Sequence, residues 1–314
     1  MKIKTLLALS FAVLCAAARP AAVQAKTLQV VATIPELGDI ASRVGGANVK
    51  VDVLARGTED IHQVVMRPSL VPKLNKADAV VYLGLTVEHS FLPGLLNVAA
   101  NPNLRHDAVK ECVGAGCIDC SEGLVVLEKP ESLSRSEGEI HPFGNPHYNL
   151  DPDDGVLIAR NIAAGFTRVD PEHAADYEKN LKAYLSELNA KLAEWRKWVA
   201  PLKGMKAVSY HQDVVYLARF TGLEFVGTLE PKPGVAPGPT HLEKLVGLMK
   251  QDKVALIVRE QQYDPKFPEF LAENTGAKVA TIGTMGKAFP DTDTFIRMSE
   301  HNLKAILSAL GKAP

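Results

Sequence analysis

Three histidines in polar loops are the residues of this chain whose type and position could do chemistry. His62 lies in the loop ARGTEDIHQ, His147 in the segment HPFGNPHYNLDP, and His211 directly after the apolar run KAVSY. Neutral imidazole is a good ligand for zinc, and three histidines leave a fourth coordination position to fill. A single loop histidine is more often a surface residue than a ligand. These three therefore make a metal site only if the fold brings them together.

Short apolar runs alternate with helical segments in both halves of the chain. The runs lie at residues 28–34, 49–54 and 79–85, and again at 206–210, 254–258 and 278–282. This alternation is typical of parallel strands joined by crossover helices. The sequence therefore predicts an α/β fold with two lobes, each built on a parallel sheet.

A long amphipathic helix is predicted between the two sets of strands. Its apolar residues repeat at steps of three and four, as Tyr177, Leu181, Tyr184, Leu188, Leu192 and Trp195. Asp170 and Pro171 suit a helix start, and Gly204 suits a stop. We expect one linking helix over 170–203, about 45 Å long, with an N-terminal lobe at 26–169 and a C-terminal lobe at 204–314.

The predicted fold gives the three histidines a common meeting place. In open parallel sheets, ligands lie beyond the carboxyl ends of the strands, and two lobes can turn those ends toward one cleft. His62 and His147 belong to the first lobe and His211 to the second. We therefore expect the site in the cleft between the lobes.

Residues 1–25 have the features of an export signal. Two lysines precede an apolar run, and the sequence VQA before Lys26 suits signal peptidase. Cys15 lacks the small preceding residue that lipidation requires, so we expect soluble export through a cleavable signal rather than a lipid anchor. The 35 basic and 36 acidic side chains give no electrostatic footprint for nucleic acid. The mature chain is expected outside the cytoplasm.

Four stretches carry a resemblance to a known family. They read, in order, GTEDIHQVVMRPSLVPKLNKADAVVYLGLTVE, GNPHYNLDP, VSYHQDVVYLARFTGLE and REQQYDPKFPEFLAENTGAKV. They resemble the motifs of periplasmic zinc- and manganese-binding receptors of bacterial ABC importers, the TroA-like superfamily. The resemblance implies two Rossmann-like lobes joined by one rigid backbone helix, with metal bound in the cleft. It also implies that His62, His147 and His211 are the first three metal ligands.

The fourth ligand of that family does not carry over. The resemblance places an aspartate shortly after the last cleft strand, where this chain has Gly283. We assign Glu260, at the end of VALIVRE, to the metal site in its place, although the family's glutamate there usually lies near the metal without binding it. Glu230 or a water molecule are the alternatives. His141 matches no ligand position, and we expect a solvated loop residue in preference to a second ligand or a capture site.

Three cysteines have the spacing of some iron–sulfur ligands but lack the fourth cysteine that such a cluster needs. They are Cys112, Cys117 and Cys120. In an oxidising compartment one disulfide and one free thiol are expected. Pairing Cys117 with Cys120 would close a very short loop, so we expect Cys112 to pair with one of the other two.

The resemblance and the histidines together predict a periplasmic receptor that is monomeric and not an enzyme. It would bind zinc and deliver the ion to an ABC-type permease in the inner membrane. Manganese is the less favoured ion, because many manganese receptors carry glutamate where this chain has His211. Two alternatives stay open. One is a zinc hydrolase with a metal-bound water and Glu260 as base, and the other is a receptor of the same fold for a chelated metal or other small ligand.

Overall fold

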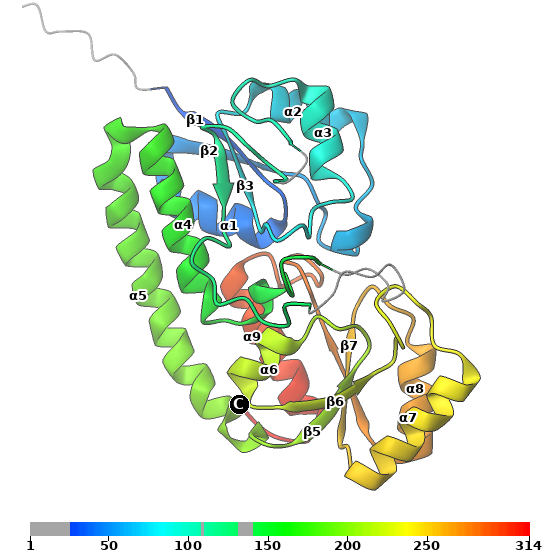
Figure 1. The fold of residues 1–314 in the computed structure, drawn as a ribbon. Coiled ribbons are helices and arrows are strands. Elements are labelled where there is room, and N and C mark those ends of the chain that lie inside the picture. Colours follow the sequence, from blue (N-terminus) through cyan, green and yellow to red (C-terminus); the bar gives the residue numbers. More distant parts are fainter. Residues whose placement is uncertain (1–25, 108–109, 131–140) are drawn as a thin grey trace, which may run out of the picture.

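The computed structural model describes residues 26–107, 110–130 and 141–314. The predicted export signal at residues 1–25 lies outside these ranges. Figure 1 shows two α/β lobes, one above the other, with the long helix α5 running down one flank of both and α4 lying beside it along the first lobe. In the described part of the chain, no helix is both long and apolar enough to cross a bilayer.

The first lobe is built on a four-stranded parallel sheet in the order β2-β1-β3-β4. Its strands are β1 (Leu28–Ala32), β2 (Val49–Val53), β3 (Ala79–Tyr82) and β4 (Cys117–Asp119). Its helices are α1 (Pro35–Gly45), α2 (Val71–Lys76), α3 (Leu92–Ala99) and α4 (Asp154–Val169). Because all strands run the same way, their carboxyl ends meet at one edge of the sheet.

The second lobe repeats this strand order, as β6-β5-β7-β8, again with all pairs parallel. Its strands are β5 (Lys206–Ser209), β6 (Glu224–Thr228), β7 (Leu256–Glu260) and β8 (Lys278–Ile282). Its helices are α6 (Val215–Thr221), α7 (Pro239–Asp252), α8 (Lys266–Thr275) and α9 (Phe295–Ala309). The predicted fold class is confirmed, although β4 and β6 were not among the predicted strands.

The linking helix α5 (Ala174–Val199) buries the face that the sequence predicts, with Val199 added. Short 3-10 turns extend it at both ends, over Pro171–His173 and Ala200–Leu202. Asp170 is the N-cap residue of the first of these turns, as predicted, but its side chain accepts no hydrogen bond from a backbone N–H of the turn. Its Oδ2 instead accepts a hydrogen bond from the Tyr177 hydroxyl at 2.6 Å.

The larger of two hydrophobic cores passes from one lobe into the other, because it contains buried residues of both sheets and of α1, α4, α5 and α9, while the smaller one lies within the second lobe. Polar contacts also join the lobes. Asn149 Nδ2 donates to Glu36 Oε1 and to the Thr284 carbonyl, each at 2.8 Å, and the Gly286 N–H donates to Glu36 Oε2 at 2.8 Å. The lobes are therefore packed together and not connected by the helix alone.

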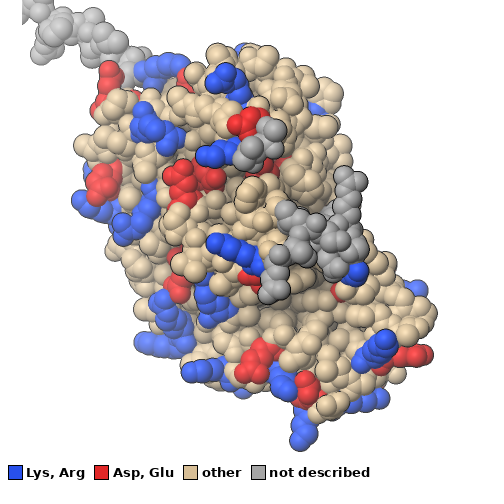
Figure 2. All heavy atoms as spheres, viewed as in Figure 1, with Lys and Arg blue, Asp and Glu red and all other residues tan. Residues whose placement is uncertain are grey.

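The structure shows which cysteine pairs with Cys112. Cys112 forms a disulfide with Cys117, the first residue of β4, and Cys120 is a buried free thiol. The expectation of one disulfide that includes Cys112 is confirmed. Acidic and basic side chains are intermixed on the face shown in Figure 2, as the nearly balanced composition predicts.

Candidate metal centre

His62 lies in a 3-10 turn, Ile61–Gln63, in the loop after β2. Asp60 caps this turn, because its Oδ1 accepts a hydrogen bond from the His62 backbone N–H at 2.9 Å. The cap fixes the backbone from which the imidazole projects. The residue is 6% exposed, so its ring is directed into the protein.

His147 lies just before the 3-10 turn Tyr148–Leu150 and is held by Asn145. Asn145 Oδ1 accepts from the His147 backbone N–H at 3.1 Å and lies 2.9 Å from its Nδ1. An Nδ1 that donates to this oxygen leaves the lone pair of Nε2 free for a metal. Asn145 Nδ2 in turn donates to the Gln212 carbonyl at 2.8 Å, next to the third histidine.

His211 lies in the loop after β5, two residues beyond the end of the strand at Ser209, and is held by a carboxylate. Its Nδ1 lies 2.7 Å from Glu230 Oε2, and both side chains are almost fully buried. Glu230 follows β6 and also accepts the Gly234 N–H at 3.1 Å. This places Glu230 on the outer nitrogen of the ring, where it fixes the tautomer that exposes Nε2.

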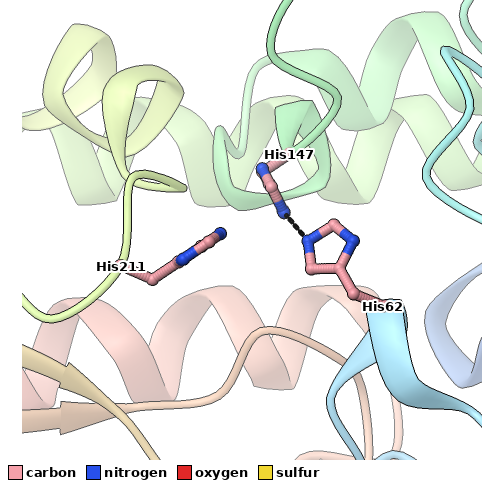
Figure 3. A group of neighbouring side chains, drawn as sticks. All are labelled: His62, His147 and His211. Atoms are coloured by element: carbon pink, nitrogen blue, oxygen red, sulfur yellow. Dashed lines mark hydrogen bonds between the residues drawn. The ribbon is translucent and has the colours of Figure 1, made fainter. Parts of the chain in front are cut away.

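The three imidazoles converge in the cleft between the lobes (Figure 3). One possible ligand atom from each of His62, His147 and His211 lies within 4.8 Å of the other two. The Nε2 atoms of His62 and His147 are 3.0 Å apart. Zinc–nitrogen bonds of about 2.0–2.1 Å in a tetrahedron separate ligand atoms by about 3.3 Å. This pair is therefore already near the spacing that a bound zinc ion needs.

Burial and charge set the protonation of these rings. Burial, together with the neighbouring histidines, holds the pKa of His62 and His147 well below the usual range. Burial also lowers the pKa of His211, but the hydrogen bond to Glu230 and the charge of Asp213 outweigh it, so the pKa is raised overall. His62 and His147 therefore favour the neutral form, in which each ring can offer a lone pair to a metal without first losing a proton.

Glu260 ends β7 and is fully buried. Its carboxylate oxygens are not in the group of ligand atoms that lie within 4.8 Å of one another. Burial, followed by the charge of Asp213, raises its pKa well above the usual range, which favours the neutral form. The structure thus brings three of the four predicted ligands together and leaves Glu260 beside Asp213.

Gly283 stands in a closely packed turn. A Cβ at this position would lie 2.6 Å from the Ala288 Cβ. The Gly283 N–H donates to Asn302 Oδ1 at 2.9 Å, and Asn302 Nδ2 donates back to its carbonyl at 2.8 Å. The turn therefore leaves no room for a side chain at position 283.

His141 is not the solvated loop residue that we expected. It is partly buried, and its ring centroid lies 5.0 Å from that of His62 and 5.9 Å from that of His147. Burial lowers its pKa to about 4. His89, which the sequence analysis did not single out, lies 6.1 Å from both His62 and His141 by ring centroid. No strand-end pattern marks His89, so the sequence offered no signal for it.

The histidines line a cavity of about 280 Å³ between the lobes. Its lining includes the candidate ligands His147 and His211, the neighbouring His141, and Glu230 and Lys232 from the proline-rich loop after β6. The cavity holds polar groups of both charges together with the imidazole rings. A small cation can therefore meet nitrogen and oxygen ligands there.

Comparison with known proteins gives consistent matches. The sequence profile of the family "Zinc-uptake complex component A periplasmic" matches residues 30–309. "High-affinity zinc uptake system protein ZnuA" of Brucella suis biovar 1 (strain 1330) is 30% identical over 166 residues, which are 52% of this chain and 50% of that protein. The match thus spans about half the length of this relative.

Two further matches cover almost the whole chain. The "Manganese ABC transporter substrate-binding lipoprotein scaA" of Streptococcus gordonii is 25% identical over 295 residues, 91% of this chain and 89% of that protein. A solved structure of a ZnuA deletion mutant "plus zinc bound" superposes with a TM-score of 0.72 at 25% identity. It covers 92% of this chain and 100% of that chain.

Proposed function

This chain belongs to the family of periplasmic zinc-uptake complex component A proteins, and on that premise we propose that it is a receptor that binds a zinc ion in the periplasm. It delivers the ion to an ABC-type permease in the inner membrane. Its relatives are named for metal uptake and substrate binding. The protein is therefore a binding protein and not an enzyme, and the hydrolase alternative is dropped.

The observation that carries this proposal is the group of three buried imidazoles from three separate segments. We assign His62, His147 and His211 as ligands. His147 and His211 each have Nδ1 beside an oxygen acceptor, which leaves Nε2 for the metal. Hydrogen-bonded outer nitrogens of this kind are usual for histidines that bind zinc.

For the fourth coordination position we assign Glu260 or a water molecule. Glu260 would have to lose the proton that its raised pKa retains before it could bind a cation. A water molecule needs no such step. Zinc is favoured over manganese because three nitrogen ligands suit zinc, whereas manganese prefers carboxylate oxygen.

The remaining assignments follow from the sequence. Residues 1–25 are a cleavable export signal, and the mature protein is a monomer. Residues 26–169 and 204–314 act as the two lobes, and residues 170–203 link them. Helix α9 belongs to the second lobe but also packs on α1 and α5. This helix is one reason to expect little relative movement of the lobes.

Metal content and competitive titration of residues 26–314 test the proposal. We expect one tightly held zinc ion per chain that manganese displaces poorly. Alanine substitution of His62, His147 or His211, one at a time, should weaken that binding. The proposal would be overturned by a purified wild-type chain that is folded but holds neither metal tightly.

A further inference from the structure

Five histidine rings form a connected cluster that extends from the candidate metal centre to the surface. Ring centroids are 5.7 Å apart for His211 and His147, and 5.1 Å apart for His147 and His62. His141 lies 5.0 Å from His62 and 5.9 Å from His147, and His89 lies 6.1 Å from both His62 and His141. The first three rings are buried, His141 is partly buried and His89 is exposed. The proposed function uses only the buried three.

The outer part of this cluster lies beside a strained turn that follows β3. Gly84, Leu85 and Thr86 follow one another with φ of 85°, 56° and 68°. For Leu and Thr such angles cost free energy, and they persist only where the surroundings enforce them. Here two buried acids do so. The Gly84 N–H donates to Glu88 Oε2 at 3.1 Å, and the Thr86 N–H donates to Glu111 Oε2 at 3.0 Å.

This turn positions both outer histidines around Thr86. His89 Nδ1 lies 2.9 Å from the Thr86 carbonyl, to which only a protonated nitrogen can donate, so Nε2 retains its lone pair. His141 Nδ1 lies 3.5 Å from the Thr86 hydroxyl oxygen. The two rings are thus held near each other by one residue, and His89 presents the tautomer that a metal ligand requires.

His62 connects the outer rings with the inner site. Its Nε2 faces His147 at 3.0 Å, whereas its Nδ1 is buried and has no hydrogen-bond partner. A buried polar atom without a partner is costly unless it has a role. The ring lies in contact distance of His141 and near His89. His62 therefore has one nitrogen for the inner site and a second that is unused there.

We propose that His89 and His141 form an outer metal site, which takes up Zn²⁺ or a similar imidazole-binding cation and passes it to the inner site past His62. This inference rests on the proposed function of the inner site. Two imidazoles completed by water hold an ion less firmly than three buried ones, so the ion moves inward. Such a relay speeds binding and release alike, and it leaves the affinity of the inner site unchanged.

The test is a calorimetric titration of residues 26–314 with Zn²⁺ alone, together with stopped-flow measurement of zinc binding. The wild-type chain should bind one ion tightly and a second weakly. His89→Ala and His141→Ala should each lose the second ion, keep the affinity for the first, and bind the first more slowly. His106→Ala is the matched control, because His106 Nδ1 is likewise held by a backbone carbonyl, that of Lys110 at 3.1 Å.

The outcomes separate the two proposals. A wild-type chain with one tight ion, no second ion and no slowing in either variant overturns the outer site and leaves the proposed function intact. If His141→Ala weakens the tight ion as much as His147→Ala does, His141 is a ligand of the inner site, which also overturns the outer pair. A folded wild-type chain without any tight ion overturns the proposed function itself.

Discussion

His211 and Glu230 form a buried pair across the loops that follow two neighbouring strands, with Nδ1 of the ring 2.7 Å from Oε2 of the carboxylate. The side chains are 6% and 8% exposed. A buried carboxylate in this position increases the electron density of the ring and fixes its orientation. Glu230 therefore acts on the metal through His211, and its role can be separated from that of a ligand.

Glu230 substitutions should weaken zinc binding without abolishing it. Glu230→Gln keeps an oxygen that can accept from Nδ1 but removes the charge, and Glu230→Ala removes both. Loss of such an outer partner typically costs about 10–100-fold in metal affinity, and we expect Gln near the lower and Ala near the upper value. Competition with a chromophoric chelator measures the affinity. Glu224→Gln, on the exposed start of β6, is the control, and equal affinity in all four proteins would contradict the prediction.

Most of the fold was predictable because six of the eight described strands are apolar runs. The two missed strands lack that signal. β4 has only three residues, with Cys117 and Asp119 at its ends, and it lies at the edge of its sheet. β6 also lies at an edge, carries Gly227 and is largely half-exposed. Edge strands bury one side less completely, so their sequences need no continuous apolar run.

The site was predictable only where the strand-end rule or the resemblance applied. His62, His147 and His211 converge as that rule implies. Glu230 was weighed only as a possible ligand, because its position on His211 depends on a strand that was not predicted. The approach of His89 and His141 depends on three consecutive positive φ angles. Such angles in Leu85 and Thr86 have no sequence signature, because both residues normally avoid them.

An aspartate at position 283 should destabilise the protein and not restore a fourth ligand. Its Cβ would lie 2.6 Å from the Ala288 Cβ, and overpacking of this kind costs about 1–3 kcal/mol. Urea unfolding should show this loss for Gly283→Asp, and Ala288→Gly in the same chain should recover part of it. Gly247→Asp is the control, because a Cβ there meets no atom within 4 Å. Tighter zinc binding by Gly283→Asp would contradict this reading of the turn.

Glu36 should make the folded chain less stable as the pH rises. Burial raises its pKa from 4.5 to about 7, against the opposing hydrogen bonds from Gly286 and Asn149. Between these values the folded chain holds a proton that the unfolded chain has lost, so stability falls with increasing pH through that window. The loss of stability caused by Glu36 is at most on the order of 3 kcal/mol. This loss is complete above about pH 7.

Glu36→Gln cannot titrate and should lack this fall. The measurement is the free energy of unfolding of wild type and variant from pH 4.5 to 8, compared as a difference so that other titrating groups cancel. That difference should shift steadily in favour of the variant as the pH rises, whatever its absolute stability. Glu243→Gln, at an exposed position on α7, should run parallel to the wild type. A constant difference between wild type and Glu36→Gln would refute the assignment.

Thiol titration should find one free cysteine in residues 26–314, and only after unfolding. Cys120 is fully buried, and burial raises its pKa well above the usual range, so the native thiol should not react with Ellman's reagent. Reduction of the Cys112–Cys117 disulfide should release two more thiols and lower stability by about 2 kcal/mol, the value for a short loop. Cys120→Ser should remove the single thiol. A native chain that reacts at once would contradict the buried position of Cys120.

Zinc binding should change the shape of the protein little. The lobes share one core and are joined by buried hydrogen bonds, such as those from Asn149 to the Thr284 carbonyl and from the Gly286 N–H to Glu36. Arg219 Nε of the second lobe also donates to Asp151 Oδ2 of the first lobe at 2.7 Å. A wide hinge motion would have to break these contacts and disrupt the packing of α5 against both lobes. We therefore expect zinc binding to rearrange only the loops around the ion.

Small-angle scattering of residues 26–314 with and without zinc measures this directly. The two profiles should give nearly the same radius of gyration, and His62→Ala, which lacks a ligand, should show no response to added zinc. A clear compaction of the wild-type chain on zinc binding would mean that the lobes are apart without metal. In that case the contacts of Asn149 and Arg219 would belong to a closed state that the ion itself stabilises.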